Sequence, residues 1–486
     1  MKAFQPALSV RLVKAIKRSE IIPGVKVAAR YGDFAAIDLH HYMGESGGVQ
    51  TTKSVREPAG GFTITLSDKR HSKALDTLYA LIEPMDMVEI RFAHDPSSYK
   101  KGEELPVIMR GLVSSVTRPE SIGQGKPDRS VTITGQDFGK ILQILFIFYL
   151  NNSAVGDNVL HEFAFFHKYA SADDAKNKSG NEFAQGVLDE VINPYLKRFS
   201  SFANGASVGA KVINEWSLKS SIDGAVSPYA VASFNNVSLH AMLCSLLDVG
   251  RFNEMFTEDT ADGVTLVIRP NPFLDASGKP IQGIEPERIS ISDKEIVSHN
   301  VSRSDNGVAN YFWVVNSRWF MMSNEEAQTA AQTGEKENYI LDTYLNSQSA
   351  FYGIRKMEVE TMLGPPDGTF SEAPKKEDIP DSTKHLSDWI DRRRKILADS
   401  NKDNVIFESG SIQVEGNERI KAGTLLVVTR ANSLPYVFYV VKVSHSYLPF
   451  RGFITDLQVE RGTGFIERSK AEKPQYQPEI DAKGVV

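Results

Sequence analysis

The sequence predicts a mainly β, α+β fold with two β-barrel domains and inserted α/β and helical segments. The chain has 486 residues, more than a single hydrophobic core normally serves. Its clearest region, residues 404–464, alternates apolar and polar residues, and Gly, Asn and Pro separate the runs. A similar pattern occurs earlier, because 107–135 resembles 436–462 in strand order, strand length and closing glycine. These observations favour a duplicated β-barrel module.

The first barrel begins to show a firm pattern at Gly61. Phe62, Ile64 and Leu66 alternate with threonines in a predicted strand. A helix is expected next, capped by Ser67 or Asp68 and ended by Pro84. Three further strands are predicted, and they are 87–92, 106–117 and 130–134.

A helix followed by a glycine and a hairpin is predicted in the middle of the chain. Ser238 has the character of an N-cap, and the leucine spacing that follows is helical up to Gly250. Strands at 251–257 and 264–268 then form a hairpin around an acidic turn.

The second barrel is predicted from strands after residue 288 and from the 404–464 region. In its last strand Phe453, Thr455, Leu457 and Val459 share one face. The opposite face carries Asp456, Gln458 and Glu460 and is predicted to meet water or a partner. A charged amphipathic helix over 382–399 leads into this region.

These patterns predict six divisions of the chain. They are a first barrel at 1–150, an insertion with the helix–hairpin unit at 151–285, the start of the second barrel at 286–320, a helical and loop insertion with a linker at 321–400, the rest of the second barrel at 401–465 and a flexible tail at 466–486.

Composition narrows the classes of function. The net charge of -6 provides no basic footprint for tight binding of nucleic acid. The single cysteine, Cys244, excludes an intrachain disulfide framework and a cysteine-based zinc site. The longest apolar run, 141–150, is about half of the roughly 20 residues that a membrane span requires, so a buried helix is expected there.

No constellation predicts an active site, a cofactor site or a metal site. Ser46 and Ser207 lie in G-x-S-x-G patterns, but neither has both the preceding strand and the following helix that this nucleophile motif requires. His161 and His167 are six residues apart, which is not the spacing of two metal ligands on one helix face. The chain is therefore expected not to be an enzyme.

Three stretches together resemble baseplate hub proteins of contractile phage tails and the hub half of type VI secretion spike proteins. They are the block at 61–135, the unit SLHAMLCSLLDVGRFNEMFTEDTADGVTLVIRPNPF at 238–273 and the C-terminal GSIQVEGNERIKAG, FYVVKVSHSY and TDLQVERGTG. The resemblance covers a little over half of the chain and leaves 145–235 and 320–400 without a counterpart. It implies that the two predicted barrels are tail-tube-like.

The resemblance implies a homotrimer whose six barrels form a pseudo-sixfold ring between the hexameric tail tube and the trimeric central spike. The tube and spike proteins would be its partners, with tape-measure and baseplate wedge proteins as further candidates. Asp456, Gln458 and Glu460 would line the channel or a subunit interface, and DNA would pass without specific binding. The location would be the virion baseplate, and the host cytoplasm during assembly. Two other functions remain open, a serine hydrolase using Ser46 or Ser207 and a receptor- or carbohydrate-binding protein of the tail tip.

Overall fold

The computed structural model describes residues 6–13, 36–45, 47–69, 77–100, 102–123, 126–147, 165–166, 169, 177–201, 213–234, 236–316, 345–366, 379–429 and 435–463. Ser46, Ser207, His161, His167 and the predicted tail at 466–486 lie outside these residues, as do residues 321–344 and 367–378 of the predicted insertion at 321–400. The fold class expected from the sequence is confirmed, because strands dominate the described part of the chain and helices are inserted between them.

Fourteen of the described strands belong to one large, mainly antiparallel sheet. Those of its N-terminal half are β1 (Ala7–Val13), β2 (Ile37–Asp38), β3 (Gly48–Ser54), β4 (Gly61–Ser67), β5 (Met87–Ala93), β6 (Val107–Thr117), β7 (Glu120–Gly123) and β8 (Lys126–Asp137). Those of its C-terminal half are β16 (Arg288–Ser292), β17 (Ile296–Ser302), β20 (Phe407–Glu415), β21 (Leu425–Thr429), β22 (Tyr436–Leu448) and β23 (Gly452–Thr463).

The two halves repeat the same order of strands, although the outermost pair is antiparallel in the first half (β1 with β5) and parallel in the second (β16 with β21). The first half orders its strands β3-β4-β8-β6, followed by β5 and β1, while the second orders them β17-β20-β23-β22, followed by β21 and β16. Matched strands therefore follow the same order along the chain. The β6–β8 ladder has a bulge between Val113 and Ser115, and the β22–β23 ladder has one between Val440 and Lys442. A bulge at the same place in both halves fixes their alignment residue by residue.

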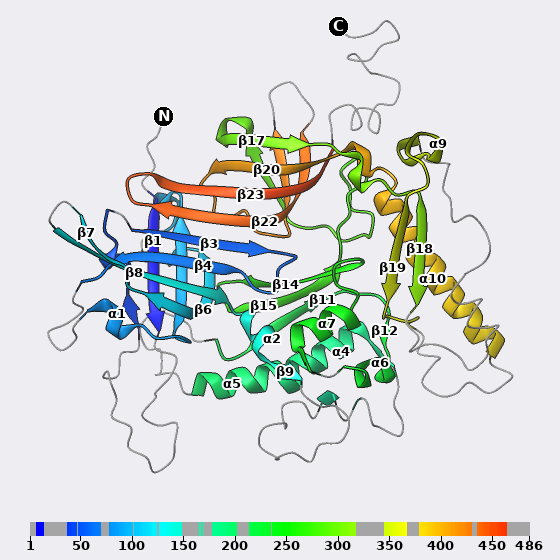
Figure 1. Cartoon of the computed structure of the whole chain (residues 1–486), viewed down its shortest axis with the longest axis horizontal. Coiled ribbons are helices and arrows are strands. Elements are labelled where there is room, and N and C mark those ends of the chain that lie inside the picture. Colours follow the sequence, from blue (N-terminus) through cyan, green and yellow to red (C-terminus); the bar gives the residue numbers. More distant parts are fainter. Residues whose placement is uncertain are drawn as a thin grey trace, which may run out of the picture.

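The halves are joined edge to edge by β22 and β3. Lys442 to Tyr447 pair antiparallel with Ser54 to Val49, so the sheet runs without a break from β17 to β6 (Figure 1). Apolar packing crosses the same joint, since Phe453 of β23 lies in the core of the N-terminal half, with its ring centroid 5.1 Å from that of Phe92. The prediction of two modules did not include this joint.

A mixed α/β unit packs beside the sheet, with helices below the β14–β15 hairpin (Figure 1). Its helices are α2 (Lys140–Ile144), α4 (Gly180–Val187), a π-helix (Leu188–Ile192), α5 (Asn193–Ser201), α6 (Pro228–Ala232) and α7 (Leu239–Leu246). Its strands are β9 (Phe146–Ile147), β10 (Lys178–Ser179), β11 (Trp216–Ser220), β12 (Ala225–Val226), β13 (Val237–Ser238), β14 (Asn253–Asp259) and β15 (Val264–Pro270). One apolar cluster joins the residues around α2, α4, α5 and α7.

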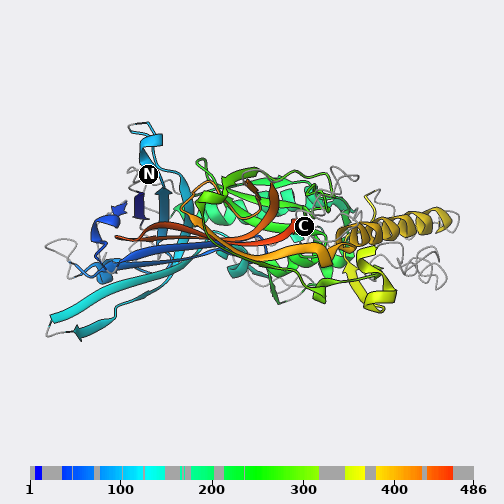
Figure 2. The same cartoon turned by 90° about the horizontal axis from the view of Figure 1, so that it is seen from above.

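The end of the molecule opposite the β7–β8 hairpin holds α10 (Ile379–Asn401), which lies beside a two-stranded parallel sheet of β18 (Tyr311–Asn316) and β19 (Lys356–Thr361) (Figures 1 and 2). The short helix α9 (Ser349–Tyr352) precedes β19. The predicted apolar face of α10 is confirmed, because Leu386, Trp389, Ile390 and Leu397 are buried.

Two local expectations need correction. Of the helix predicted between Asp68 and Pro84, the described part is only the single turn α1 (Leu78–Leu81), whose Tyr79 amide donates to the Asp68 carboxylate over 3.2 Å. The apolar run at 141–150 is not one buried helix, because α2 ends at Ile144 and β9 follows at Phe146. Within the described residues, no helix is both long and apolar enough to cross a membrane.

Candidate interaction face and its buried supports

One face of the joined sheet carries polar side chains across eight strands from β17 to β6, and it is called the polar face below. Strand registers place these side chains in rows across the ladders. Its members include Asn300, Ser411, Gln413, Asp456, Gln458, Lys442, Ser444, Gln50, Thr52, Thr63, Thr65, Thr132, Thr134, Ser115 and Thr117. Hydroxyl and amide groups predominate, so the face is hydrophilic without a strong field of either sign.

The three residues singled out from the sequence all lie on this side of β23. Phe453, Thr455, Leu457 and Val459 are buried, as predicted, and the side chains between them are wholly or partly exposed. Asp456 lies opposite Gln413 and Ser444, and the Gln413 amide donates to its carboxylate over 2.7 Å.

Gln458 and Glu460 differ in their surroundings. Gln458 lies opposite Ser411 and Lys442 and is exposed. Glu460 lies opposite Tyr439 and forms an ion pair with Arg56 at the margin of the polar face, where the hairpin unit begins to cover the sheet. Gln458 is therefore the most accessible of the three, while Asp456 and Glu460 are both partly exposed.

Polar contacts tie the two halves together across the β22–β3 joint. The hydroxyls of Thr52 and Ser444 are 2.9 Å apart on the polar face. Lys442 of β22 forms an ion pair of 2.8 Å with Glu57, just beyond β3. Arg56 and Glu460 add a third contact between the halves.

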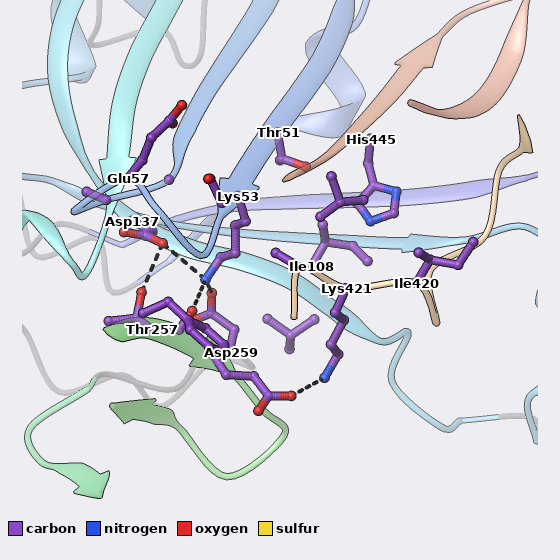
Figure 3. A pocket seen from close by; sticks show the side chains of 18 of the residues that line it. Thr51, Lys53, Glu57, Ile108, Asp137, Thr257, Asp259, Ile420, Lys421 and His445 are labelled. Carbon is purple, nitrogen blue, oxygen red and sulfur yellow. Dashed lines mark hydrogen bonds and ion pairs between the residues drawn. The ribbon is translucent and has the colours of Figure 1, made fainter. Parts of the chain in front are cut away.

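A buried cluster beneath the joint holds the β14–β15 hairpin against the N-terminal half (Figure 3). Lys53 Nζ lies 3.1 Å from Asp137 Oδ2 of β8 and 2.6 Å from Asp259 Oδ2 of β14. Thr257 donates its hydroxyl to Asp137 over 3.1 Å. Burial alone would lower the pKa of Lys53, but Asp259 and Asp137 outweigh burial and raise it, so the ammonium group stays charged.

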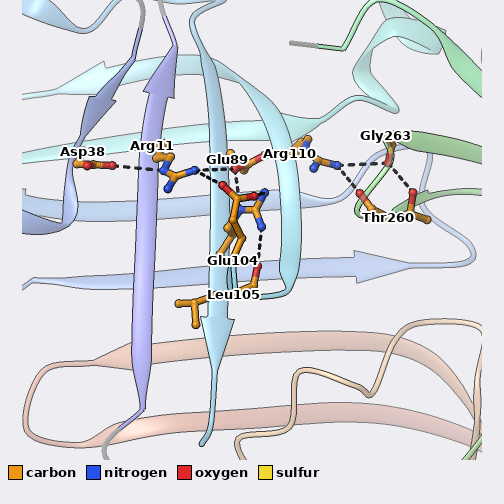
Figure 4. Close-up of polar contacts among 9 residues, drawn as sticks. Arg11, Asp38, Glu89, Glu104, Leu105, Arg110, Thr260 and Gly263 are labelled. Atoms are coloured by element: carbon orange, nitrogen blue, oxygen red, sulfur yellow. Dashed lines mark hydrogen bonds and ion pairs between the residues drawn. The ribbon is translucent and has the colours of Figure 1, made fainter. Parts of the chain in front are cut away.

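A second cluster fixes the turn of the same hairpin against β6 (Figure 4). Arg110 Nε lies 2.8 Å from Glu89 Oε2, and Arg110 Nη1 donates to the carbonyl of Thr260 over 2.6 Å. Glu89 also pairs with Arg91 over 2.7 Å. Because Arg110 and Glu89 are fully buried, their pairing is required to offset the loss of water around both charges.

A third cluster connects the hairpin to the C-terminal half. Glu254 of β14 pairs with Arg269 of β15 over 2.7 Å, and the Tyr439 hydroxyl donates to Glu254 over 2.5 Å. Burial, and then the charge of Glu254, raise the pKa of Tyr439 well above its ordinary value, so the hydroxyl remains a donor. The helix–hairpin unit thus bridges both halves of the sheet and fixes their relative orientation.

These clusters were not identified from the sequence, although a signal was present. Glu89 and Arg91 interrupt the otherwise apolar strand MVEIRFA, and Arg110 interrupts VIMRGLV. A charge inside an apolar run predicts a buried ion pair, but its partner is set by the tertiary fold. The acidic turn near Asp259 is confirmed as part of a hairpin, and Asp259 itself is also a partner of Lys53.

The described groups that could react or bind a metal have ordinary structural surroundings. Burial raises the pKa of the Cys244 thiol to about 12, so it is protonated at neutral pH. Asp38, His40 and His41 bring possible ligand atoms within 4.8 Å of one another, a grouping that sequence reasoning missed. Asp38 already pairs with Arg11 over 3.5 Å, which weakens this grouping as a cation site.

No protein-family model matches the chain, and no curated protein sequence matches it. Similar solved structures include a tail protein from Neisseria meningitidis MC58, with 11% identity, 96% of this chain and 99% of that chain covered, and a TM-score of 0.46. The 43 kDa tail protein of prophage MuSo2 from Shewanella oneidensis has 10% identity, covers 94% and 98%, and has a TM-score of 0.44. Prophage tail protein gp18 from Listeria monocytogenes EGD-e has 9% identity, covers 93% and 94%, and has a TM-score of 0.43.

These structures are tail proteins, the class that the sequence resembles. Their identities are near one residue in ten and their TM-scores are below 0.5.

Proposed function

We propose that this chain is a structural baseplate hub of a contractile phage tail. Three copies form a pseudo-sixfold ring that joins the hexameric tail tube to the trimeric central spike and surrounds the passage for DNA. Its partners are the tube and spike proteins, with tape-measure and wedge proteins as further candidates. It acts in the baseplate of the virion after assembly in the host cytoplasm. The division into two tube-like barrels with the boundaries given above is part of this proposal.

The observation that carries the proposal is the repetition of the two halves together with their edge-to-edge joint. One chain supplies two matched four-stranded units, β3-β4-β8-β6 and β17-β20-β23-β22, already paired side by side through β22 and β3. A ring that presents sixfold features on one side and threefold features on the other needs a subunit of this kind. Closing the ring also pairs the strand edges that a single copy leaves open.

The polar face supports a channel-lining role for Asp456, Gln458 and Glu460. Asp456 and Gln458 lie opposite Ser411, Gln413, Ser444 and Lys442, of which only Lys442 is a cation that could hold a phosphate group. A wall of this composition suits DNA that must move past without being retained. The proposed role is non-enzymatic, in keeping with the structural character of the described ion-pair clusters.

The mass of the chain in solution tests the proposal. Analytical ultracentrifugation is expected to show a species of three times the 53.9 kDa chain, either alone or after addition of the tube or spike protein of the same phage. A monomer at all concentrations that binds neither protein contradicts the proposal. Reaction of Ser46 or Ser207 with a fluorophosphonate probe would instead favour the hydrolase alternative, and glycan binding by the isolated chain would favour the receptor-binding one.

A further inference from the structure

The joint between the two halves also specifies how one copy pairs with the next. β22 uses its edge in two parts, since residues 436–439 pair with β21 and residues 442–447 pair with β3. Its counterpart β6 is divided in the same way. Residues 107–112 pair with β5, but residues 114–117 pair with no described strand on that side.

The counterpart of β3 is β17, which ends the sheet. β17 pairs with β20 on one side, and no described strand lies along its other side. Residues 114–117 of β6 and the strand β17 are therefore the two edges of a second joint, which a single chain cannot form by itself. They lie at opposite ends of the eight-stranded polar face.

Neither open edge carries the usual protection against pairing. Natural edge strands are often blocked by Lys or Pro, but residues 114–117 read SSVT and β17 reads IVSHNVS. Ser114, Ser115 and Thr117 on one edge, and Ser298, Asn300 and Ser302 on the other, are exposed in the single chain. Polar edges without Lys or Pro can form backbone hydrogen bonds with an open strand of a partner.

We propose that β6 of one copy pairs antiparallel with β17 of the next copy, with Thr117 opposite Ser302 of that copy. The inference rests on the proposed function, because it requires several copies in one ring. It adds which strands of neighbouring copies pair and in which register. The joint between copies then reproduces the joint between β22 and β3 within the chain.

The register follows from the ladders. The two bulges align Lys442 with Ser115 and Ser444 with Thr117. The ladders to β20 and β4 align Asn300 with Gln50, because Asn300 lies opposite Ser411 and Gln50 lies opposite Thr63. Two residues further on, Ser302 corresponds to Thr52.

Ser444 and Thr52 are directly opposite each other in the joint within the chain, with their hydroxyls 2.9 Å apart. Thr117 and Ser302 of the next copy are their counterparts, so the new pair lies on the polar face. The predicted joint therefore extends the hydroxyl-rich surface without a break from one copy to the next.

Disulfide trapping tests the register. In a Cys244→Ala background, the double variant Thr117→Cys, Ser302→Cys is expected to form linked dimers and trimers on mild oxidation. Opposite residues of an antiparallel pair have Cα atoms about 4.5–5.5 Å apart, within the range that a disulfide spans. Thr52→Cys, Ser444→Cys is the positive control and should form an intrachain disulfide.

The matched negative control is Thr117→Cys, Ser298→Cys, which uses an exposed serine on the same strand and face. Ser298 is four residues from Ser302, about 13 Å along a strand, so at least tenfold less linked product is expected. Circular dichroism and thermal melting show whether each variant folds.

The outcomes separate this inference from the proposed function. A trimeric mass with no linked product from the in-register pair, or with equal product from the control pair, overturns the register and leaves the hub proposal standing. A monomeric mass with no affinity for tube or spike protein overturns both. Linked trimers from the in-register pair alone support both.

Discussion

At the scale of single residues, the side chains that matter most for stability are charged and buried. Lys53 is only 16% exposed and pairs with two carboxylates that are 2–3% exposed. Lys442 also pairs with a carboxylate, that of Glu57, but near the surface, at 29% and 47% exposure. The same residue type therefore has two different roles in the same joint.

Lys53→Met is expected to lower the free energy of unfolding by about 3–5 kcal/mol, because Asp137 and Asp259 would be left buried without their cation. Lys442→Met is the matched control and should lower it by less than about 1 kcal/mol, as for other exposed ion pairs. Urea unfolding followed by tryptophan fluorescence measures both. Equal losses for the two variants would show that the buried cluster is not held by charge pairing.

At the scale of elements, the two halves place a glycine on opposite strands of a matched pair, and the two glycines face different neighbours. A Cβ atom at Gly135 would meet the Phe62 ring, whereas one at Gly410 would meet the backbone of Asn300 and Val301. In the N-terminal half, Phe62 of β4 lies opposite Gly135 of β8. In the C-terminal half, the matched positions are Gly410 of β20 and Val459 of β23. A large residue on one strand is thus accompanied by glycine on the other, and the glycine changes strand between the halves.

Gly135→Ala is expected to destabilise the fold by about 1–3 kcal/mol through overpacking. A Cβ atom at Gly135 would lie 2.2 Å from Phe62 Cζ and 2.4 Å from the Leu112 carbonyl oxygen. Gly61→Ala is the control, since its Cβ would contact only the Gly135 carbonyl oxygen, at 3.8 Å. Thermal melting of both variants, and of Gly135→Ala combined with Phe62→Leu, measures the effect.

If the clash with the ring is the cause, the added Phe62→Leu change should recover part of the loss, so that the two effects are not additive. Additive losses would place the strain in the backbone instead.

The elements predicted best from the sequence are those whose signals are local. Ser238 caps α7, accepting from the Ala241 amide over 3.2 Å, and Gly250 follows with φ +101, as the helix–glycine–hairpin pattern indicated. The β6–β8 and β22–β23 pairs were predicted from alternation and their terminating glycines. The parallel pairing of β11 with β15 was not, because it joins residues nearly fifty positions apart without a local turn signal.

At the scale of the whole molecule, the polar face was half predictable. Alternation along β23 predicted that the Asp456 side chain points away from the core. It did not predict that eight strands share this polar face. That continuity depends on the pairing of β22 with β3, whose residues are almost 400 positions apart. The buried clusters depend on tertiary contacts in the same way.

Charge reversal on this face is expected to impair the passage of DNA through the assembled ring and to leave the stability of the chain nearly unchanged. Asp456→Lys replaces a partly exposed carboxylate and should alter the free energy of unfolding by less than about 1 kcal/mol, as for most surface changes. In the proposed ring it places one added cation per copy beside the DNA, so phage titre should fall.

Glu358→Lys is the control for this prediction, because Glu358 is 53% exposed on β19, outside the large sheet. Thermal melting of the isolated chain and plaque titres of phage carrying each variant are the measurements. If Asp456→Lys unfolds the chain while Glu358→Lys does not, the polar face is not an open surface.

The covalent link between the halves has a consequence for how a ring of this chain would come apart. Contacts through β22 and β3 belong to one folded polypeptide, so dilution cannot separate them, whereas contacts through β6 and β17 depend on the concentration of copies. A dissociating ring would therefore release blocks of two units and never a single unit. Joints within a chain would alternate around the ring with joints between chains, and only the second kind could open. Because each chain contributes two matched halves, the ring would always contain an even number of them.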